Sequence, residues 1–417
     1  MKLYPYAAGI AAGLLALSLT ACSGNTGTTT QPAATSTTVT PVTLTVWSPR
    51  EDQADAQSWL PKEEAAFQAA HPEYQITWKN SVVSESDAAT TVQKDPTAAA
   101  DVYMFANDQL GTLIQANAIG KLPPASVTQV QQQNTDVMVN SVKGTDGSLY
   151  GVPYTANTWF LYYNKAKLSA DDVKNLDTML SKGKIAFPLD TAWYLPSFYV
   201  GNGCTLFGPD GTDASAGLDF SGTKASDVTA YLAKMVANPN FVDDANGAGL
   251  AGLQNGTIDA YFSGSWDAAA VKTALGDNMG AAQPPTFTLN GSAVQMKAFA
   301  GSKAVAFNPN AQNPQAAAQF AAFLGSKQAQ EDHYTMRGII PSDKSLATDA
   351  SVTADPVATA QMNTVSNASI LQPTLAAMGN FWDPATAFGK ALVSKEVTEA
   401  NAVDKTAAWN ASYAASK

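Results

Sequence analysis

Apolar and polar residues alternate along the segment from Val42 to Trp47, and the run ends at Ser48-Pro49. This alternation, rich in β-branched residues, predicts a strand that leads into a loop. Between residues 59 and 70 the apolar positions recur every three or four residues instead, which predicts a helix that stops before His71-Pro72. A second strand is expected at 74–78. Strand, helix and strand in succession are typical of an α/β protein.

The same succession continues through the rest of the chain. Strands are expected at 101–105, 149–153, 160–164, 184–187, 258–262 and 297–307, and helices at 108–116, 169–180, 225–237, after Trp266, at 313–325 and up to 338. The segment Ser169-Ala-Asp-Asp172 resembles a capping box that opens one continuous helix to Leu180. Because the pattern restarts near residue 169, two α/β units account for the length better than one.

The N-terminal segment has the pattern of an export signal. Lys2 precedes an apolar run from Ala7 to Leu19, and Leu19-Thr-Ala-Cys22 follows at once. The run is too short for a membrane-spanning helix, which needs about 20 residues. The tetrapeptide resembles the lipobox of bacterial lipoproteins, so residues 1–21 are expected to be removed and Cys22 to carry a two-chain lipid anchor. Residues 22–41 are small, polar and uncharged, and we expect them to form a flexible tether.

Composition narrows the classes of ligand. Charged residues make up only 14% of the 417 residues and the net charge is −11, which argues against binding of nucleic acid or of an anionic membrane surface. Two cysteines and two histidines argue against zinc-cluster and disulfide-framework proteins. With Cys22 in the anchor, Cys204 is left as a small buried thiol without a role. No metal or other cofactor is expected.

Catalytic motifs are absent from the sequence. There is no nucleophile elbow, P-loop or metalloprotease motif, and neither His71 nor His333 shares a motif with an acid or a nucleophile. Gly201-Asn-Gly203 lacks the third glycine of a dinucleotide fingerprint and is interpreted as a turn. One enzymatic alternative stays open, a glycoside hydrolase built on a pair of the carboxylates that lie at the ends of predicted elements: Glu85, Asp101, Asp108, Asp190 and Asp267.

Aromatic residues gather where α/β proteins place their ligands, at strand ends and in loops. These aromatics are Phe105, Trp159, Trp193-Tyr194, Trp266 and Phe381-Trp382, and their polar neighbours are Asn107, Asp108, Asn157, Asp190, Asp267 and Asp383. A pyranose ring has apolar C–H faces and a rim of hydroxyls, so it needs flat aromatic faces with carboxylate or amide groups at the edges. The pattern therefore predicts a sugar site, with burial of some of these rings in the core as the alternative.

Several segments, in the same order, resemble bacterial maltose-binding proteins. They are Ala100-Asp-Val-Tyr-Met-Phe-Ala-Asn-Asp-Gln-Leu-Gly111, Gly147-Ser-Leu-Tyr-Gly-Val-Pro153, Tyr162-Tyr-Asn-Lys165, the glycine-to-tryptophan segment 256–266, Arg337-Gly-Ile-Ile-Pro341 and Asn380-Phe-Trp382. The resemblance spans Val42 to Ser412 and, together with the lipobox, is specific for the extracellular carbohydrate-binding proteins of ABC importers.

The resemblance implies an α/β fold of the periplasmic-binding-protein type II, with two lobes, hinge strands and a ligand cleft between the lobes. We expect the N-terminal lobe at 42–155 plus 302–350 and the C-terminal lobe at 156–301 plus 351–417. Family positions carried over by motif are Phe105, Asp108, Trp193, Trp266 and Trp382, with Glu51 and Glu85 aligned more loosely. The aromatic loops add Asn157, Trp159, Tyr194 and Asp267 to the predicted ligand-binding residues.

The implied function is that of a monomeric, lipid-anchored receptor on the outer face of the membrane, in a bacterium that is expected to be Gram-positive. Such a protein is not an enzyme; it hands a sugar to the permease subunits of an ABC importer. Two departures affect the substrate: Gln109 stands where maltose-binding proteins carry an arginine, and Asn157 where they carry a glutamate. A maltodextrin is the leading substrate, with another oligosaccharide, or a surface-anchored glycoside hydrolase activity, as the alternatives.

Overall fold

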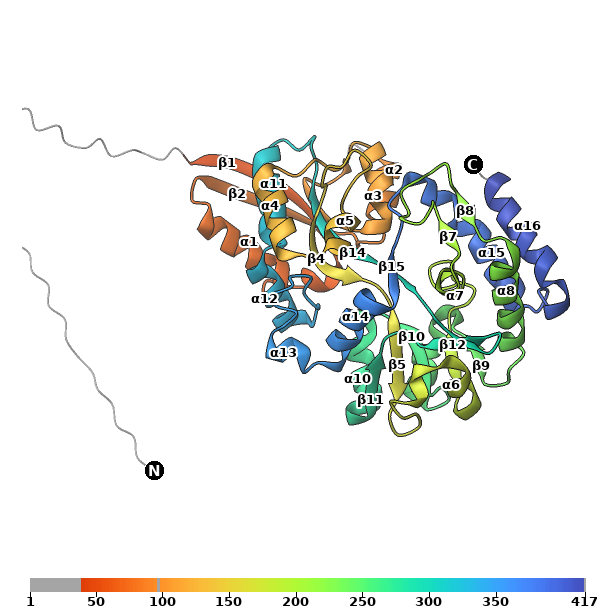
Figure 1. Cartoon of the computed structure of the whole chain (residues 1–417). Coiled ribbons are helices and arrows are strands. Elements are labelled where there is room, and N and C mark those ends of the chain that lie inside the picture. Colours follow the sequence, from red (N-terminus) through yellow and green to blue (C-terminus); the bar gives the residue numbers. More distant parts are fainter. Residues whose placement is uncertain (1–38, 96–97, 416–417) are drawn as a thin grey trace, which may run out of the picture. The chain divides into compact units, whose positions relative to one another are not determined.

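The computed structural model describes residues 39–95 and 98–415 (Figure 1). The predicted signal segment, Cys22 and most of the predicted tether lie outside these residues. The described chain forms the expected two-lobe α/β fold, in which each lobe is built on its own sheet. Within the described residues, no helix has both the length and the apolar character that crossing a membrane requires.

The sheet of the first lobe has the strand order β15-β14-β3-β1-β2, and β4 also pairs with β14. Its strands are β1 (Thr40–Ser48), β2 (Tyr74–Val82), β3 (Val102–Ala106), β4 (Val152–Asn157), β14 (Ala298–Phe307) and β15 (Ser369–Leu371). The helices of this part are α1 (Trp59–Ala70), α2 (Ala88–Lys94), α3 (Leu110–Gln115), α4 (Pro124–Gln133), α5 (Asp136–Ser141), α11 (Pro314–Leu324) and α12 (Lys327–Arg337). The strands and the helix expected between residues 42 and 78 are confirmed.

The sheet of the second lobe has the order β11-β5-β10-β6-β9. Its strands are β5 (Phe160–Asn164), β6 (Ile185–Phe187), β9 (Phe241–Asp243), β10 (Ala260–Ser263) and β11 (Met279–Ala282), and two small hairpins join β7 (Thr205–Leu206) to β8 (Leu218–Asp219) and β12 (Thr286–Leu289) to β13 (Ser292–Gln295). The remaining helices are α6 (Leu176–Lys182), α7 (Pro196–Gly201), α8 (Gly222–Val236), α9 (Ala248–Asn255), α10 (Ala268–Leu275), α13 (Ala350–Thr353), α14 (Pro356–Asn367), α15 (Trp382–Val393) and α16 (Ala402–Ala415).

The crossing from β4 to β5 and the long strand β14 connect the two lobes. The chain leaves the first sheet through β4 and enters the second through β5 after only Thr158 and Trp159 (Figure 1). The long strand β14 belongs to both hydrophobic cores, because Ala298 and Phe299 pack in one cluster and 304–307 in the other. Its first residues also pair with β15 in parallel. Ligand sites in two-lobe proteins form beside such crossings, where both lobes can reach one molecule.

One expected helix is broken in two. The capping box is present, since the Ser169 N–H donates to Asp172 Oδ2 and the Asp172 N–H donates to Ser169 Oγ. The turn it opens ends at Lys174, however, and α6 begins afresh at Leu176. Asn175, extended at φ −139°, caps this second start by accepting from the Thr178 N–H. The prediction of one continuous helix from 169 to 180 is therefore wrong, because the asparagine side chain offers the backbone a local alternative.

Candidate ligand-binding cavity

A cavity of about 550 Å³ lies between residues of both lobes. It is lined by Ser86, Ala106, Asp108, Asn157, Trp193, Trp266, Lys303 and Trp382. Ala106 and Asp108 stand at the end of β3, Asn157 and Lys303 lie on the crossover strands β4 and β14, and the three tryptophans come from the second lobe. The volume is within the range of about 300–1,000 Å³ that is usual for small-molecule sites.

Tryptophans form one wall of this cavity. The rings of Trp193 and Trp266 lie with their centroids 6.0 Å apart and their planes 40° from parallel. Trp266 is 47% exposed, which is unusual for so large an apolar ring. Its ring rests on Gly264, where a Cβ atom would come within 2.0 Å of the indole, so the glycine is needed for this orientation. An exposed, paired aromatic surface of this kind is suited to stacking against the apolar face of a sugar ring.

Trp193 is fixed from behind by a buried amide. Its indole N–H donates to Gln372 Oε1 at 2.8 Å, and Gln372 is only 1% exposed. The backbone N–H of Gln372 in turn donates to the Ala300 carbonyl on β14. The orientation of this cavity tryptophan is therefore tied directly to a crossover strand.

The other wall of the cavity is polar. Asp108 is half-buried after β3, and burial raises the pKa of its carboxyl group to about 6. Asn157 contributes a neutral amide and Lys303 an ammonium group. Carboxylate, amide and ammonium together can accept hydrogen bonds from hydroxyl groups and donate hydrogen bonds to them.

Because the ionised form of Asp108 is the better acceptor for ligand hydroxyls, we expect affinity to be full well above pH 6 and to fall as the pH is lowered through 6. In Asp108→Asn this pH dependence should vanish over the range 5 to 7, and calorimetric titrations at several pH values measure it. Burial also favours the protonated form of Asp108 in the folded protein. The carboxyl group therefore adds to the free energy of unfolding at low pH, and this contribution is lost as the pH rises through 6. The same variant should therefore melt at a higher temperature at pH 7.5 without ligand. A wild-type affinity that does not change between pH 5 and 7 would contradict the assignment.

Two predicted stacking aromatics lie in the cores instead. Phe105 and Trp159 are fully buried, and neither lines the cavity, which differs from the prediction. All five residues of β3 are buried between β1 and β14, and alternation along the strand brings Ala106 rather than Phe105 to the cavity. Trp159 stacks on Tyr194 with centroids 5.1 Å apart, so both support the second-lobe wall from behind.

The predicted acids are also divided between several environments. Asp108 lines the cavity, while Glu51, Glu85 and Asp267 do not. Glu51 is exposed on a short turn after β1. Asp267 accepts hydrogen bonds from Ser263 Oγ at 2.6 Å and from the Tyr261 hydroxyl at 3.1 Å. Through these two hydrogen bonds Asp267 fixes the turn that carries Trp266.

Gln109, the residue that replaces the family's arginine, has a structural role. It is 8% exposed; its Oε1 accepts from the Ala89 N–H at 2.7 Å, and its Nε2 donates to the Glu85 carbonyl at 2.9 Å. It therefore joins the start of α2 to the segment that carries Glu85.

Two lining residues, Ser86 and Lys303, were not among the sequence candidates. Lys303 lies in β14 between Ser302 and Ala304, which are both fully buried. In the sequence, the alternation along this strand is the only sign that the lysine faces away from the core. Ser86 lies in a loop without any regular pattern. The cation of the cavity could be found only from the folded structure.

A larger cavity of about 1,070 Å³ lies elsewhere, among loops from segments 140–147, 200–212 and 370–375. Glycines are common in its lining and, among the described residues, no aromatic side chain contributes to it. Cys204 lines it as a buried thiol whose pKa burial raises to about 12, in line with the expectation of an unreactive cysteine. Of these two cavities, the one of about 550 Å³ therefore combines aromatic stacking surfaces with polar groups.

Carboxylates are few around the cavity in the described part of the chain. Only one carboxylate, Asp108, lines the 550 Å³ cavity there, whereas the common glycosidase mechanism uses two. No cluster of three or more His, Cys, Asp or Glu residues suited to a metal ion occurs among the described residues.

Comparisons with known proteins agree on one family. A family model described as bacterial extracellular solute-binding protein matches residues 65–360. The maltooligosaccharide ABC transporter solute-binding lipoprotein of Streptococcus pneumoniae is 28% identical over 303 residues, which cover 68% of this chain and 69% of the relative. A galactooligosaccharide-binding protein of Bacillus subtilis is 26% identical over 329 residues, which cover 74% and 75% of the two chains.

Solved structures also resemble this chain over most of its length. A structure with acarbose is 51% identical, has a TM-score of 0.85, and the match covers 89% of this chain and 98% of the other. The maltodextrin binding protein MalE1 from L. casei, solved without ligand, is 30% identical with a TM-score of 0.82, and the match covers 90% and 99% of the two chains.

Proposed function

Since this chain belongs to the family of bacterial extracellular solute-binding proteins, we propose that it is the sugar receptor of an ABC importer and that it binds a maltodextrin-like oligosaccharide. The observation that carries the proposal is the 550 Å³ cavity, which Trp193, Trp266 and Trp382 line together with Asp108, Asn157 and Lys303. This arrangement matches the apolar faces and hydroxyl rims of pyranose rings. The names of the similar proteins support the same ligand class.

The binding cycle follows from the two lobes. Because the lining residues come from both lobes, a sugar that contacts both favours a closed arrangement by its differential affinity for it. The permease subunits would recognise the closed form, one sugar at a time. We propose lobe boundaries at 42–155 plus 302–350 and 156–301 plus 351–417 for this motion, in a protein that works as a monomer.

The test is a calorimetric screen of maltose, maltotriose, maltotetraose, acarbose, raffinose and a galacto-oligosaccharide against the purified chain without its signal. We expect micromolar or tighter binding of the α-glucans, together with a change in tryptophan fluorescence, because tryptophans line the cavity. A galacto-oligosaccharide as the tightest ligand would favour the specificity named for the Bacillus subtilis relative. A flat titration with every α-glucan would contradict the maltodextrin assignment.

The glycoside hydrolase alternative has a simple control. After prolonged incubation with maltotetraose, a receptor returns the ligand intact, whereas a hydrolase leaves shortened products that chromatography detects.

We propose further that Cys22 carries a lipid anchor on the outer face of the membrane. The lipobox-like Leu19-Thr-Ala-Cys22 and the lipoprotein name of the Streptococcus pneumoniae relative support this location. A Cys22→Ser chain expressed in a Gram-positive host should lose the lipid. Cys204→Ser is the matched control and should stay in the membrane fraction.

A further inference from the structure

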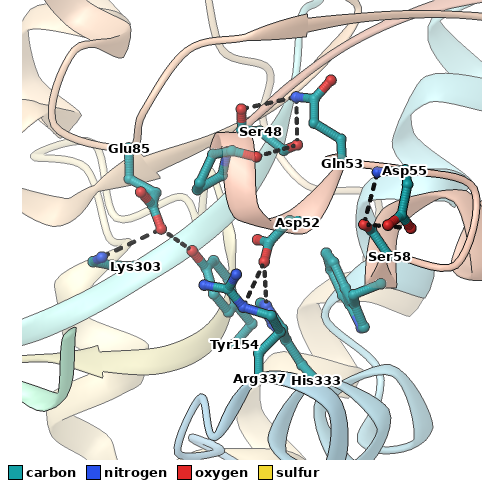
Figure 2. Close-up of polar contacts among 12 residues, drawn as sticks. Ser48, Asp52, Gln53, Asp55, Ser58, Glu85, Tyr154, Lys303, His333 and Arg337 are labelled. Atoms are coloured by element: carbon teal, nitrogen blue, oxygen red, sulfur yellow. Dashed lines mark hydrogen bonds and ion pairs between the residues drawn. The ribbon is translucent and has the colours of Figure 1, made fainter. Parts of the chain in front are cut away.

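Lys303, the ammonium group of the cavity, is held by a chain of three side chains that runs into the first lobe. Lys303 Nζ lies 3.3 Å from Glu85 Oε1, and the same oxygen accepts a hydrogen bond from the Tyr154 hydroxyl at 2.6 Å. Figure 2 shows Glu85 between the other two. The three residues come from β14, β4 and the segment before α2, so tertiary structure alone brings them together.

An irregularity in the crossover strands places Tyr154. Lys303 is paired with Thr155, and the next residue, Ala304, is paired with Pro153, so Tyr154 is the extra residue of a β-bulge. Bulges of this kind redirect a side chain and are frequent beside functional sites. Tyr154 is 2% exposed and its ring stacks near His333, with centroids 5.7 Å apart. Burial, and then the neighbouring Glu85, hold the pKa of Tyr154 well above its usual value, so its hydroxyl stays a donor.

Glu85 is fixed at its backbone as well. The carbonyl of Glu85 accepts from the Ala106 N–H at 3.1 Å and from Gln109 Nε2 at 2.9 Å, which ties it to the cavity end of β3. The side chain is only 11% exposed, against 24% for that of Lys303. The carboxylate therefore faces Tyr154 and Lys303, and the lysine is the member of the chain that lines the cavity.

We infer that Lys303 is a specificity-determining residue for neutral, hydroxyl-rich sugars, and that Glu85 and Tyr154 are the residues that position it. The inference rests on the proposed sugar-binding function. An ammonium group has three N–H donors; one is directed at Glu85, which leaves two for adjacent hydroxyl oxygens of a ligand. Among the described residues, Lys303 is the only cation that lines the cavity.

The charges explain why a neutral ligand is selected. Glu85 compensates the charge of Lys303, and Asp108 adds a further negative charge at neutral pH. A sugar that carries a carboxylate would meet a wall with a net negative charge in a partly desolvated cavity, where like charges repel strongly. Hydroxyl groups meet no such penalty, because they can both accept from Lys303 and donate to Asp108.

The first experiment measures the affinity of Lys303→Met for maltotriose by calorimetry. Methionine keeps the apolar stem and removes the donors, so we expect at least tenfold weaker binding. Lys297→Met is the matched control, since Lys297 lines the larger cavity and should leave the affinity within twofold of wild type. Circular dichroism and melting temperature establish that both variants fold.

The second experiment tests whether Glu85 and Tyr154 act through Lys303. Glu85→Gln and Tyr154→Phe should each weaken maltotriose binding three- to tenfold in the wild type, and by less than twofold when Lys303→Met is already present. In Glu85→Gln, the affinity for a maltotriose with one 6-hydroxymethyl group oxidised to a carboxylate should rise at least fivefold relative to that for maltotriose itself.

The possible failures are distinguishable. If wild type binds maltotriose and Lys303→Met binds it within twofold as tightly, the inference is overturned and the proposed function stands. If the effects of Glu85→Gln and Tyr154→Phe are the same with and without Lys303, their positioning role is overturned. If wild type binds no oligosaccharide at all, the proposed function fails and the inference fails with it.

Discussion

Replacing Trp266 with alanine is expected to weaken oligosaccharide binding at least tenfold, and replacing Trp193 as well should weaken it at least a hundredfold. Trp266 lines the cavity, is 47% exposed, and lies with its ring centroid 6.0 Å from that of Trp193. Aromatic contacts contribute about 1 kcal/mol beyond the area they bury, and about 1.4 kcal/mol corresponds to tenfold in affinity. Calorimetry with maltotriose measures both variants.

Two further variants sharpen this expectation. Trp266→Phe keeps a flat aromatic face and should recover most of the affinity, whereas Trp266→Leu keeps apolar character without the face and should not. Trp409→Phe, a change in the second-lobe core where Trp409 is 3% exposed, controls for loss of tryptophan in general. Unchanged affinity in Trp266→Ala would remove this residue from the site.

Replacing Asp52 with alanine should lower the free energy of unfolding by about 3 kcal/mol, the scale for breaking a buried ion pair from one side. Asp52 is 2% exposed, and its Oδ1 lies 3.0 Å from His333 Nε2 and 3.6 Å from Arg337 Nε (Figure 2). His333 stacks on Trp59 with ring centroids 4.0 Å apart. The carboxylate therefore joins the turn after β1 to α12, and its removal leaves the buried His333 Nε2 without its partner.

Asp55→Ala is the matched control for this change. Asp55 lies in the same loop but is exposed and bonds only to nearby loop atoms, so its removal should change the free energy of unfolding by less than about 0.5 kcal/mol. Urea unfolding followed by far-ultraviolet circular dichroism measures both variants. Equal midpoints for the two variants would show that the contact of Asp52 with α12 contributes little to stability.

Local patterns were sufficient to predict the fold class and many of its helices and strands. The alternation at 42–47 and the three-to-four-residue spacing at 59–70 lie in β1 and α1, because both elements bury one face. The break after Lys174 was missed, because an asparagine cap competes with helix continuation through geometry that the apolar pattern does not contain.

The residues of the candidate site likewise divide into those that local patterns indicated and those that only the fold places. Trp193, Trp266, Trp382, Asp108 and Asn157 were candidates from loop position and residue type, and all five line the cavity. Phe105 and Trp159 had the same kind of position, but strand alternation and stacking direct them into the cores. A position near the end of a strand therefore indicates the region of a site, while the neighbouring strands decide which side chain faces it.

The sequence by itself determined the fold class, the family, the likeness of the N-terminus to a lipoprotein signal and the group of aromatics from which a sugar platform could be drawn. These features depend on residue type and on spacing over a few positions. Only the tertiary structure decided which rings are exposed and that Lys303 is held by Glu85 and Tyr154. Those contacts join residues up to 218 positions apart, and one of them depends on a bulge in the pairing of β4 with β14, which no local pattern along the chain can encode.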